Sequence, residues 1–319
     1  MAKALRFYQL ADGYAYNSDS LLLLDFAAQF CKNTPKNILD MGAGCGILGI
    51  SCAHYFHAQV VAIESQPKVA LLAAINAKTA PFHTHNEPST PKGSCQVLCA
   101  NFLDKATPQQ ALALLATMHN QAQKNPQENT QENSAQTPRI HLHTPPKSKP
   151  SPKFDLLIAN PPFYRDGALK SINEFLRQAR YESQLPLQAW IHQSKRLLAP
   201  RGALVFCFQA SEIARVLEAL KQESFTCEIL RFVYPLPSKR AKIALFYARL
   251  DSRAQMHIEP PLFTHNSPKQ SDFTQEVARI YAAYRTHSIK VYAQDIVDPI
   301  LLDHCRETLT IIPHQATAH

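Results

Sequence analysis

The sequence contains no long apolar run and no paired cysteine motif. None of its hydrophobic segments approaches the roughly 18 residues of a membrane-spanning helix, and its first residues lack the apolar core of a secretory signal peptide. The eight cysteines include no Cys-x-x-Cys pair, and the fourteen histidines show no metal-binding spacing. In a chain of 319 residues such cysteines are expected to be reduced thiols. These absences argue against secreted, membrane-bound and disulfide-stapled proteins, and we expect a cytoplasmic, metal-free monomer.

Glycine is also scarce, and its placement is uneven. The chain has only eight glycines, and four of them lie between positions 42 and 49. A chain so poor in glycine that concentrates half of it in one place needs an unusual backbone there. By contrast, hydrophobic residues make up 45% of the chain, which is enough for a large domain with appendages, and the formal charge of +8 admits an anionic partner such as nucleic acid.

Short apolar runs alternate with helical patterns along most of the chain. Strands are expected at 37–41, 59–64, 95–100, 154–159, 203–208, 228–233 and 242–250. Helices are expected at 19–30, 46–55, 67–78, 186–198 and 210–222. This alternation predicts an α/β fold with a mostly parallel sheet and helices on both faces. A short turn around Pro235 predicts that the last two strands pair antiparallel.

Two segments break this rhythm. Residues 105–153 hold eleven Asn or Gln, seven Pro and none of the 28 aromatic residues of the chain. Such a composition buries too little apolar area to offset the entropy of ordering, so we expect a largely disordered insertion in which only 111–118 could be helical. Residues 81–94 are similar on a smaller scale. The longer segment carries a charge of +4, which weakens the overall charge as a guide to the folded surface.

A glycine-rich segment, Asp-Met-Gly-Ala-Gly-Cys-Gly at 40–46, joins an expected strand to an expected helix. Its glycines allow close approach of a ligand, and the helix N-terminus offers free N–H groups. Glu64 ends the next strand, where a carboxylate can accept two ribose hydroxyls. A dinucleotide site prefers Gly-x-Gly-x-x-Gly, whereas Gly-x-Gly-x-Gly after an acidic residue resembles motif I of the class I S-adenosylmethionine methyltransferases. The resemblance implies a Rossmann-like, seven-stranded fold and cofactor contacts from Asp40, Gly42, Gly44, Gly46 and Glu64, with Asn101 and Phe102 beside the adenine.

A second motif, Asn160-Pro161-Pro162-Phe163, follows the expected strand 154–159. An exocyclic or amide nitrogen is a poor nucleophile because its lone pair is conjugated. The Asn160 side-chain oxygen and the Pro161 carbonyl can each accept one N–H of that nitrogen, which aims its lone pair at a methyl donor. The prolines remove competing backbone donors, and Phe163 offers a face for stacking. These four residues are therefore the candidate catalytic group, acting by positioning rather than by a strong base.

Further segments make the chain resemble the bacterial tRNA1(Val) (adenine(37)-N6)-methyltransferase family. The similar segments are the opening Asp12-Gly-Tyr-Ala-Tyr-Asn-Ser-Asp-Ser20, Ala179–Glu182, Leu198–Gly202, Tyr234–Arg240 and Phe273–Glu276. The resemblance implies that Tyr14 and Asp19, with Ser20, cover the cofactor pocket. We therefore expect a cofactor-covering segment at 1–34, a methyltransferase domain at 35–284 with the two insertions, and a tail at 285–319 that the resemblance does not cover.

The acceptor is expected to be the N6 amine of an adenine in structured RNA, most simply a tRNA anticodon loop. Between Arg231 and Arg253 six basic residues and one Asp give a charge of +5, and Lys239, Arg240 and Lys242 are the candidate RNA contacts. The motif chemistry leaves three alternatives open: a glutamine of a translation factor, guanine N2 of ribosomal RNA, and a non-catalytic RNA-binding protein. Enzymes of the glutamine class carry a helical domain ahead of motif I, whereas 39 residues precede Asp40 here.

Overall fold

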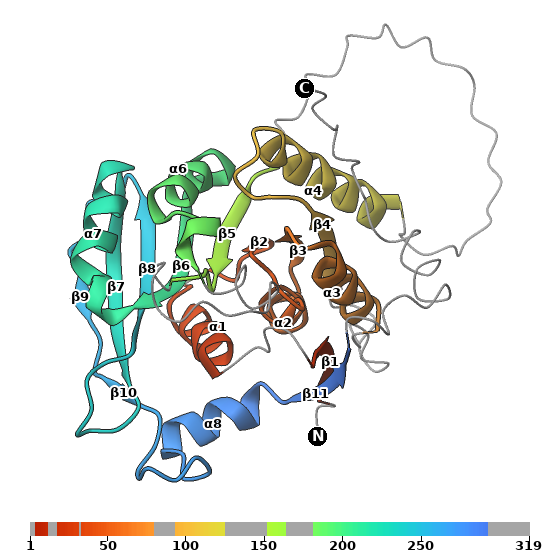
Figure 1. Ribbon diagram of the computed structural model, residues 1–319. Helices are drawn as coiled ribbons and strands as arrows, with labels where there is room; N and C mark the ends of the chain where they lie inside the picture. Colours follow the sequence, from red (N-terminus) through yellow and green to blue (C-terminus); the bar gives the residue numbers. More distant parts are fainter. Residues whose placement is uncertain are drawn as a thin grey trace, which may run out of the picture.

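The computed structural model describes residues 4–11, 18–31, 33–79, 93–124, 152–163 and 181–292. Its main sheet runs in the order β7-β8-β6-β5-β2-β3-β4 (Figure 1). Only β8 is antiparallel to its neighbours in this run, as the sequence predicted. These strands are β2 (Asn37–Met41), β3 (Gln59–Glu64), β4 (Ser94–Cys99), β5 (Phe154–Ala159), β6 (Leu198–Gln209), β7 (Phe225–Tyr234) and β8 (Ile243–Leu250). Two short strands, β9 (His257–Ile258) and β10 (Leu262–Phe263), pair with β7 outside this run.

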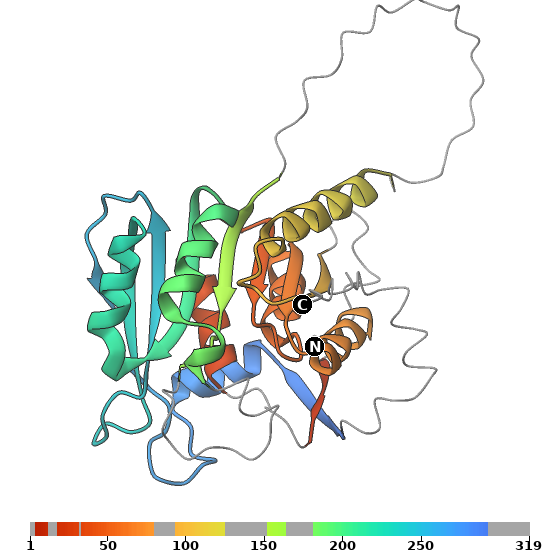
Figure 2. The same ribbon diagram turned by 45° about the horizontal axis from the view of Figure 1, so that its top comes forward.

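Helices cover both faces of the sheet, which confirms the predicted fold class. On one face lie α1 (Ser18–Phe30), α2 (Ile47–Phe56) and α3 (Pro67–Thr79), which contact one another in succession. On the other lie α4 (Thr107–Lys124), α6 (Leu187–Leu197) and α7 (Ile213–Gln222) (Figure 2). The remaining helices are α8 (Gln275–Ala283), which packs on α1, and the 3₁₀ turns η1 (Glu182–Gln184) and η2 (Ala210–Glu212). No helix among the described residues is long and apolar enough to cross a membrane.

The disordered insertion predicted at about 105–153 is wrong for its first part. Residues 107–124 form α4, which packs on β3 and α6. Ala111, Leu114, Leu115 and Met118 recur at helical spacing and are buried, while Ala113 and Thr117 between them are exposed. Average composition concealed this stripe because the Asn and Gln side chains occupy the solvent side. Residues 125–151 of the predicted insertion, and 81–92 of the shorter one, lie outside the described residues, and Ser94 already belongs to β4.

A second, two-stranded sheet joins the two ends of the described chain. In it β1 (Leu5–Leu10) runs parallel to β11 (Thr286–Val291), and β1 packs on α3 (Figure 1). The pairing extends from Leu5, whose N–H donates to the Arg285 carbonyl at 3.0 Å, to Ala11, whose N–H donates to the Val291 carbonyl at 2.7 Å. The sequence analysis predicted neither strand, and it assigned residues from 285 onward to a separate tail. The pairing instead attaches 286–291 to the methyltransferase domain.

Candidate active site

The glycine-rich segment forms a left-handed loop between β2 and α2. Gly42, Gly44 and Gly46 have φ angles of 68°, 56° and 86°, a region that side-chain-bearing residues rarely adopt. A Cβ atom on Gly42 or Gly44 would meet no atom within 4 Å, so both backbones border open space, and both residues line the main pocket. Gly46 is the N-cap residue of α2. Among the predicted glycines, Gly42 and Gly44 therefore present backbone to a ligand, and Gly46 does not line the pocket.

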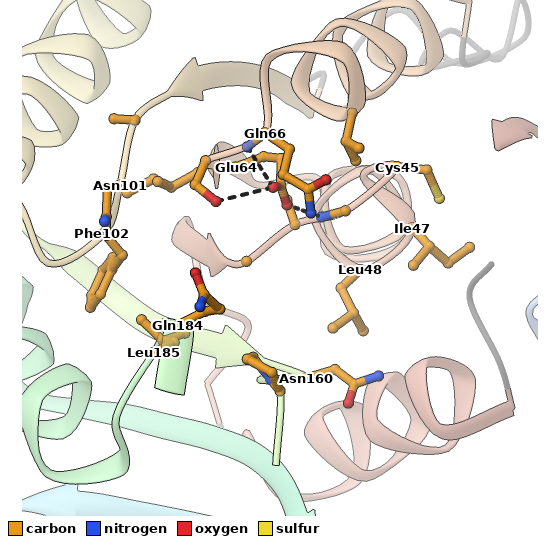
Figure 3. Close-up of a pocket in the computed structure, with 18 of the residues that line it drawn as sticks. Cys45, Ile47, Leu48, Glu64, Gln66, Asn101, Phe102, Asn160, Gln184 and Leu185 are labelled. Atoms are coloured by element: carbon orange, nitrogen blue, oxygen red, sulfur yellow. Dashed lines mark hydrogen bonds between the residues drawn. The ribbon is translucent and has the colours of Figure 1, made fainter. Parts of the chain in front are cut away.

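Glu64 lies at the end of β3 and holds this loop in place. Its Oε2 accepts the Gly44 N–H at 2.9 Å and its Oε1 accepts the Gln66 N–H at 2.9 Å (Figure 3). Burial raises the pKa of the carboxyl, and the N–H groups of Gln66 and Gly44 oppose that rise. A carboxylate can accept about four hydrogen bonds. Glu64 lines the pocket, so acceptor capacity remains on the pocket side for ligand hydroxyls.

Asp40 occupies a different position from the one that the motif suggested. It is fully buried, it does not line the pocket, and its Oδ2 accepts the Gly49 N–H at 2.7 Å. A Cβ on Gly49 would lie only 3.0 Å from that oxygen, so glycine at 49 permits the contact. The assignment of Asp40 as a direct cofactor ligand is therefore wrong in this structure. Its carboxylate ties the first turn of α2 to β2 behind the loop.

We expect Asp40 to make stability depend on pH. Burial raises its pKa from 3.8 to about 7, and the charge of Glu64 adds to the rise while the Gly49 N–H opposes it. Between these pH values the folded chain retains a proton that the unfolded chain releases, so the free energy of unfolding falls as pH rises through this window. In Asp40→Asn this part of the pH dependence is absent, which denaturant unfolding across the window measures.

The exposed Asp251 provides the control for this prediction. Asp251→Asn makes the same chemical change at an exposed turn and serves as the matched variant for the effect of replacing an aspartate by asparagine. An identical pH dependence in Asp40→Asn and the wild type would contradict the buried, protonated carboxyl.

Asn160 follows β5 and lies across the pocket from Glu64 (Figure 3). Its Oδ1 accepts the Cys207 thiol of β6 at 3.0 Å, and its Nδ2 donates to the Ser20 hydroxyl of α1 at 3.3 Å. Burial raises the pKa of the Cys207 thiol, which keeps it protonated and able to donate. Two elements from distant parts of the chain thus orient the Asn160 amide, and the second lone pair of its oxygen is available to a substrate.

The other residues of the Asn-Pro-Pro-Phe motif divide between pocket and core. Pro162 lines the pocket, whereas Pro161 is buried and does not. The ring of Phe163 is buried and packs 5.8 Å from the ring of Phe208, at an interplanar angle of 59°. Phe163 is not among the residues that line the pocket. The predicted stacking face of Phe163 is thus turned to the core in this structure.

The pocket unites residues from seven regions of the chain. Of the other predicted cofactor residues, Asn101 and Phe102 line it, the buried Asp19 on α1 does not, and Tyr14 lies outside the described residues. The sequence analysis missed several lining residues: Leu10, Cys45, Ile47, Leu48, Ser65, Gln66, Val69, Gln184 and Leu185. Cys45 and Gln66 adjoin residues that were found and could have been predicted from their position. Leu10 and Leu185 carry no chemical signature and come together with the loop only in the fold.

The basic residues between Arg231 and Arg253 fall into two groups, those exposed to solvent and those close to a carboxylate. Lys239, Arg240 and Lys242 are exposed in the turn between β7 and β8, at the edge of the sheet where β5 ends at the active-site Asn160. Arg231 instead is buried and paired with Glu276 at 2.8 Å, and Arg249 lies 3.6 Å from Glu228. The charge of +5 counted along the sequence therefore overstates the free positive charge at this edge.

The site fits a cofactor with a ribose and an amino-acid moiety. Open space borders the left-handed glycines, an acidic side chain ends β3, and Asn101 and Phe102 line the pocket directly after β4. In fold, the chain is similar to a predicted O-methyltransferase from Agrobacterium tumefaciens, with a TM-score of 0.52, 19% identity and coverage of 86% of this chain and 100% of that one. No family model matches the chain. In fold the chain is therefore similar to a class I methyltransferase, and the pocket has the lining expected for S-adenosylmethionine.

The relatives in sequence are more specific. The chain is 24% identical to a tRNA1(Val) (adenine(37)-N6)-methyltransferase of Porphyromonas gingivalis over 281 residues, 86% of this chain and 90% of that protein. It is 30% identical to the protein of the same name from Parabacteroides distasonis over 158 residues, 47% of this chain and 60% of that protein. The Vibrio cholerae protein of that name is 23% identical over 82% of this chain. The chain thus resembles this group of tRNA methyltransferases along most of its length.

Proposed function

We propose that this methyltransferase modifies the N6 amine of an adenine in structured RNA, most simply in a tRNA anticodon loop. The observation that carries the proposal is Asn160, which lies at the pocket wall opposite Glu64 with its amide held by Cys207 and Ser20. The names of the relatives support an RNA acceptor, and the exposed basic turn at the same edge of the sheet offers contacts for its phosphates.

S-adenosylmethionine supplies an electrophilic methyl group when it is bound. The chain holds it with Glu64 on the ribose side and with the backbone of Gly42 and Gly44. Asn160 Oδ1 accepts one hydrogen of the acceptor amine, which withdraws the lone pair from the ring and aims it at the methyl group. The nitrogen gains the methyl and loses one proton to solvent. Catalysis rests on positioning, so no strong base is required.

The acceptor is tested by incubating the full chain with labelled S-adenosylmethionine, bulk tRNA and translation release factors. We expect label in tRNA, recovered as N6-methyladenosine after digestion to nucleosides. Label in protein alone would overturn the RNA proposal, and label in N2-methylguanosine would retain RNA but reject adenine.

Charge reversal in the basic turn tests the RNA contacts. Lys239→Glu with Arg240→Glu should weaken RNA binding roughly tenfold and lower the slope of log K against log salt by about 1 for each lost phosphate contact. The affinity for S-adenosylmethionine should not change, because neither residue lines the pocket. Fluorescence titration with tRNA over a range of salt concentrations measures both quantities.

The matched control carries the same charge change on the opposite edge of the sheet. Lys221 at the end of α7 and Arg253 after β8 are both exposed there. Lys221→Glu with Arg253→Glu should leave RNA affinity nearly unchanged. Equal losses in the two double variants would show a general charge effect and contradict a specific contact.

A further inference from the structure

One buried side chain connects the small β1–β11 sheet to the glycine-rich loop. Asn76 of α3 has no exposed surface, and its amide makes three hydrogen bonds. The Tyr8 N–H donates to Oδ1 at 2.8 Å, while Nδ2 donates to the Tyr8 carbonyl at 2.9 Å and to the Cys45 carbonyl at 2.8 Å. Because all three partners are backbone groups with one possible role each, the orientation of the amide is unambiguous.

The register of the small sheet explains why Tyr8 is available. In a parallel pair, alternate residues point their backbone groups at the partner strand. Leu5 and Ala11 donate to β11, so the backbone groups of Tyr8 face the other edge of β1. Asn76 fills the place of a third strand there, with one acceptor and one donor for Tyr8.

The third hydrogen bond reaches the cofactor site. Cys45 lies between Gly44 and Gly46, and it lines the pocket, as does Leu10 two residues after Tyr8. Leu10 packs with Leu71 and Leu72 of α3 and with Val291 of β11. Pairing with β11, the hydrogen bonds of Asn76 and the position of the loop are therefore parts of one connected unit.

We propose that Asn76 is a positioning residue that couples the β1–β11 sheet to the glycine-rich loop and thereby sets the affinity for S-adenosylmethionine. A residue that only satisfied the backbone of Tyr8 would need no bond to Cys45. The bond to the Cys45 carbonyl restrains the loop directly after Gly44, whose backbone borders the ligand space. The C-terminal strand β11 accordingly contributes to cofactor binding without touching the pocket.

Asn76→Asp tests the coupling, because it keeps the acceptor for the Tyr8 N–H and replaces the double donor by an oxygen that faces two carbonyls. We expect the Kd for S-adenosylmethionine, measured by calorimetry without RNA, to rise at least about tenfold. Turnover at saturating cofactor should stay within about twofold of the wild type, since Asn160 is untouched. Amide hydrogen exchange of the 42–46 loop should accelerate in the cofactor-free protein.

Val216→Ala is the stability control, because Val216 is fully buried on α7 and does not line the pocket. It should lower stability while leaving the cofactor Kd and loop exchange as in the wild type. A Kd for Asn76→Asp within twofold of the wild type, or a rise matched by Val216→Ala, would overturn the proposal. Asn76→Ala, which removes the amide without adding a charge, provides the same readout if the aspartate variant does not fold.

Two proline variants of β11 test the contribution of that strand in the full chain. By the alternation in the ladder, the N–H of Ile289 faces β1 and the N–H of Lys290 faces away. Ile289→Pro should raise the cofactor Kd and Lys290→Pro should not. Equal Kd values in these two variants would overturn the role of β11. The affinity and hydrogen-exchange measurements omit RNA, so their failure is distinct from failure of the RNA proposal.

Discussion

Asn160→Ala is expected to lower turnover on the RNA substrate by about 10²- to 10³-fold, the cost of removing one pre-organised polar group from a reacting centre. The alanine cannot accept the amine hydrogen, so the lone pair stays conjugated with the ring. The Kd for S-adenosylmethionine should change little, because the backbone of 42–46 and Glu64 lie across the pocket and keep their hydrogen bonds. Single-turnover kinetics at saturating cofactor, together with calorimetry, separate the two effects.

Cys207→Ala is the matched control for this prediction. It removes the thiol that donates to Asn160 Oδ1 but retains the amide itself. The loss of turnover should be no more than about tenfold, since a single weak hydrogen bond that orients the amide is removed. Near-normal turnover in Asn160→Ala would refute the mechanism, and a loss as large in Cys207→Ala would assign the effect to the packing of β6.

Glu64→Ala is expected to weaken binding of S-adenosylmethionine by about 1.5–3 kcal/mol, which corresponds to about 10- to 150-fold in Kd. The structure gives two reasons for a large effect. The variant removes the charged acceptor at the pocket wall, and it releases the N–H groups of Gly44 and Gln66 that the carboxylate holds at 2.9 Å. Calorimetric titration of the full chain without RNA measures the change.

The raised pKa of Glu64 adds a pH signature to this prediction. Only the ionised carboxylate accepts without donating, so wild-type affinity should fall as the solution is acidified through a pKa above the ordinary 4.5. Glu64→Gln should bind weakly at all pH values with a flatter profile. Gly44→Val provides an independent test of the pocket, because its side chain would project into the open space beside the loop from a left-handed backbone. Unchanged affinity in both Glu64→Ala and Gly44→Val would move the cofactor site elsewhere.

The α/β fold and the two motifs were predictable because their signals are local. Apolar runs of strand length, separated by helical patterns, specify a doubly covered sheet wherever they occur. A glycine cluster between a strand and a helix predicts a left-handed backbone at that point, and Gly42, Gly44 and Gly46 all adopt this conformation. Glu64 ends β3, and Asn160 directly follows β5. Both strands are parallel neighbours of β2, so the topology places the two residues at the same edge of the sheet.

Other features depend on which side of an element a residue occupies. The sequence predicted only residues 111–118 of helix α4, because the residues on either side of that stretch are mostly polar, while its buried apolar side chains point to the sheet. Asp40 and Gly42 are two residues apart in one motif, yet one lies behind the loop and the other in front of it. Arg231 and Lys239 contribute equally to a count of charge, but within the described part of the chain only Arg231 has a carboxylate within reach.

The links between distant segments belong to the tertiary structure alone. The hydrophobic patterns of residues 5–10 and 286–291 are too weak to predict that these distant segments pair. A parallel pair also has no tight turn between its strands that the sequence could reveal. Nothing in the sequence distinguishes Asn76 from other polar residues of α3. Only the fold brings the backbone of Tyr8 and of Cys45 within hydrogen-bond distance of its amide. Hydrogen bonds to backbone have no residue-type signature, because every residue carries the same N–H and C=O groups. For that reason the sequence specifies the chemistry of the pocket, and packing decides which segments hold it in position.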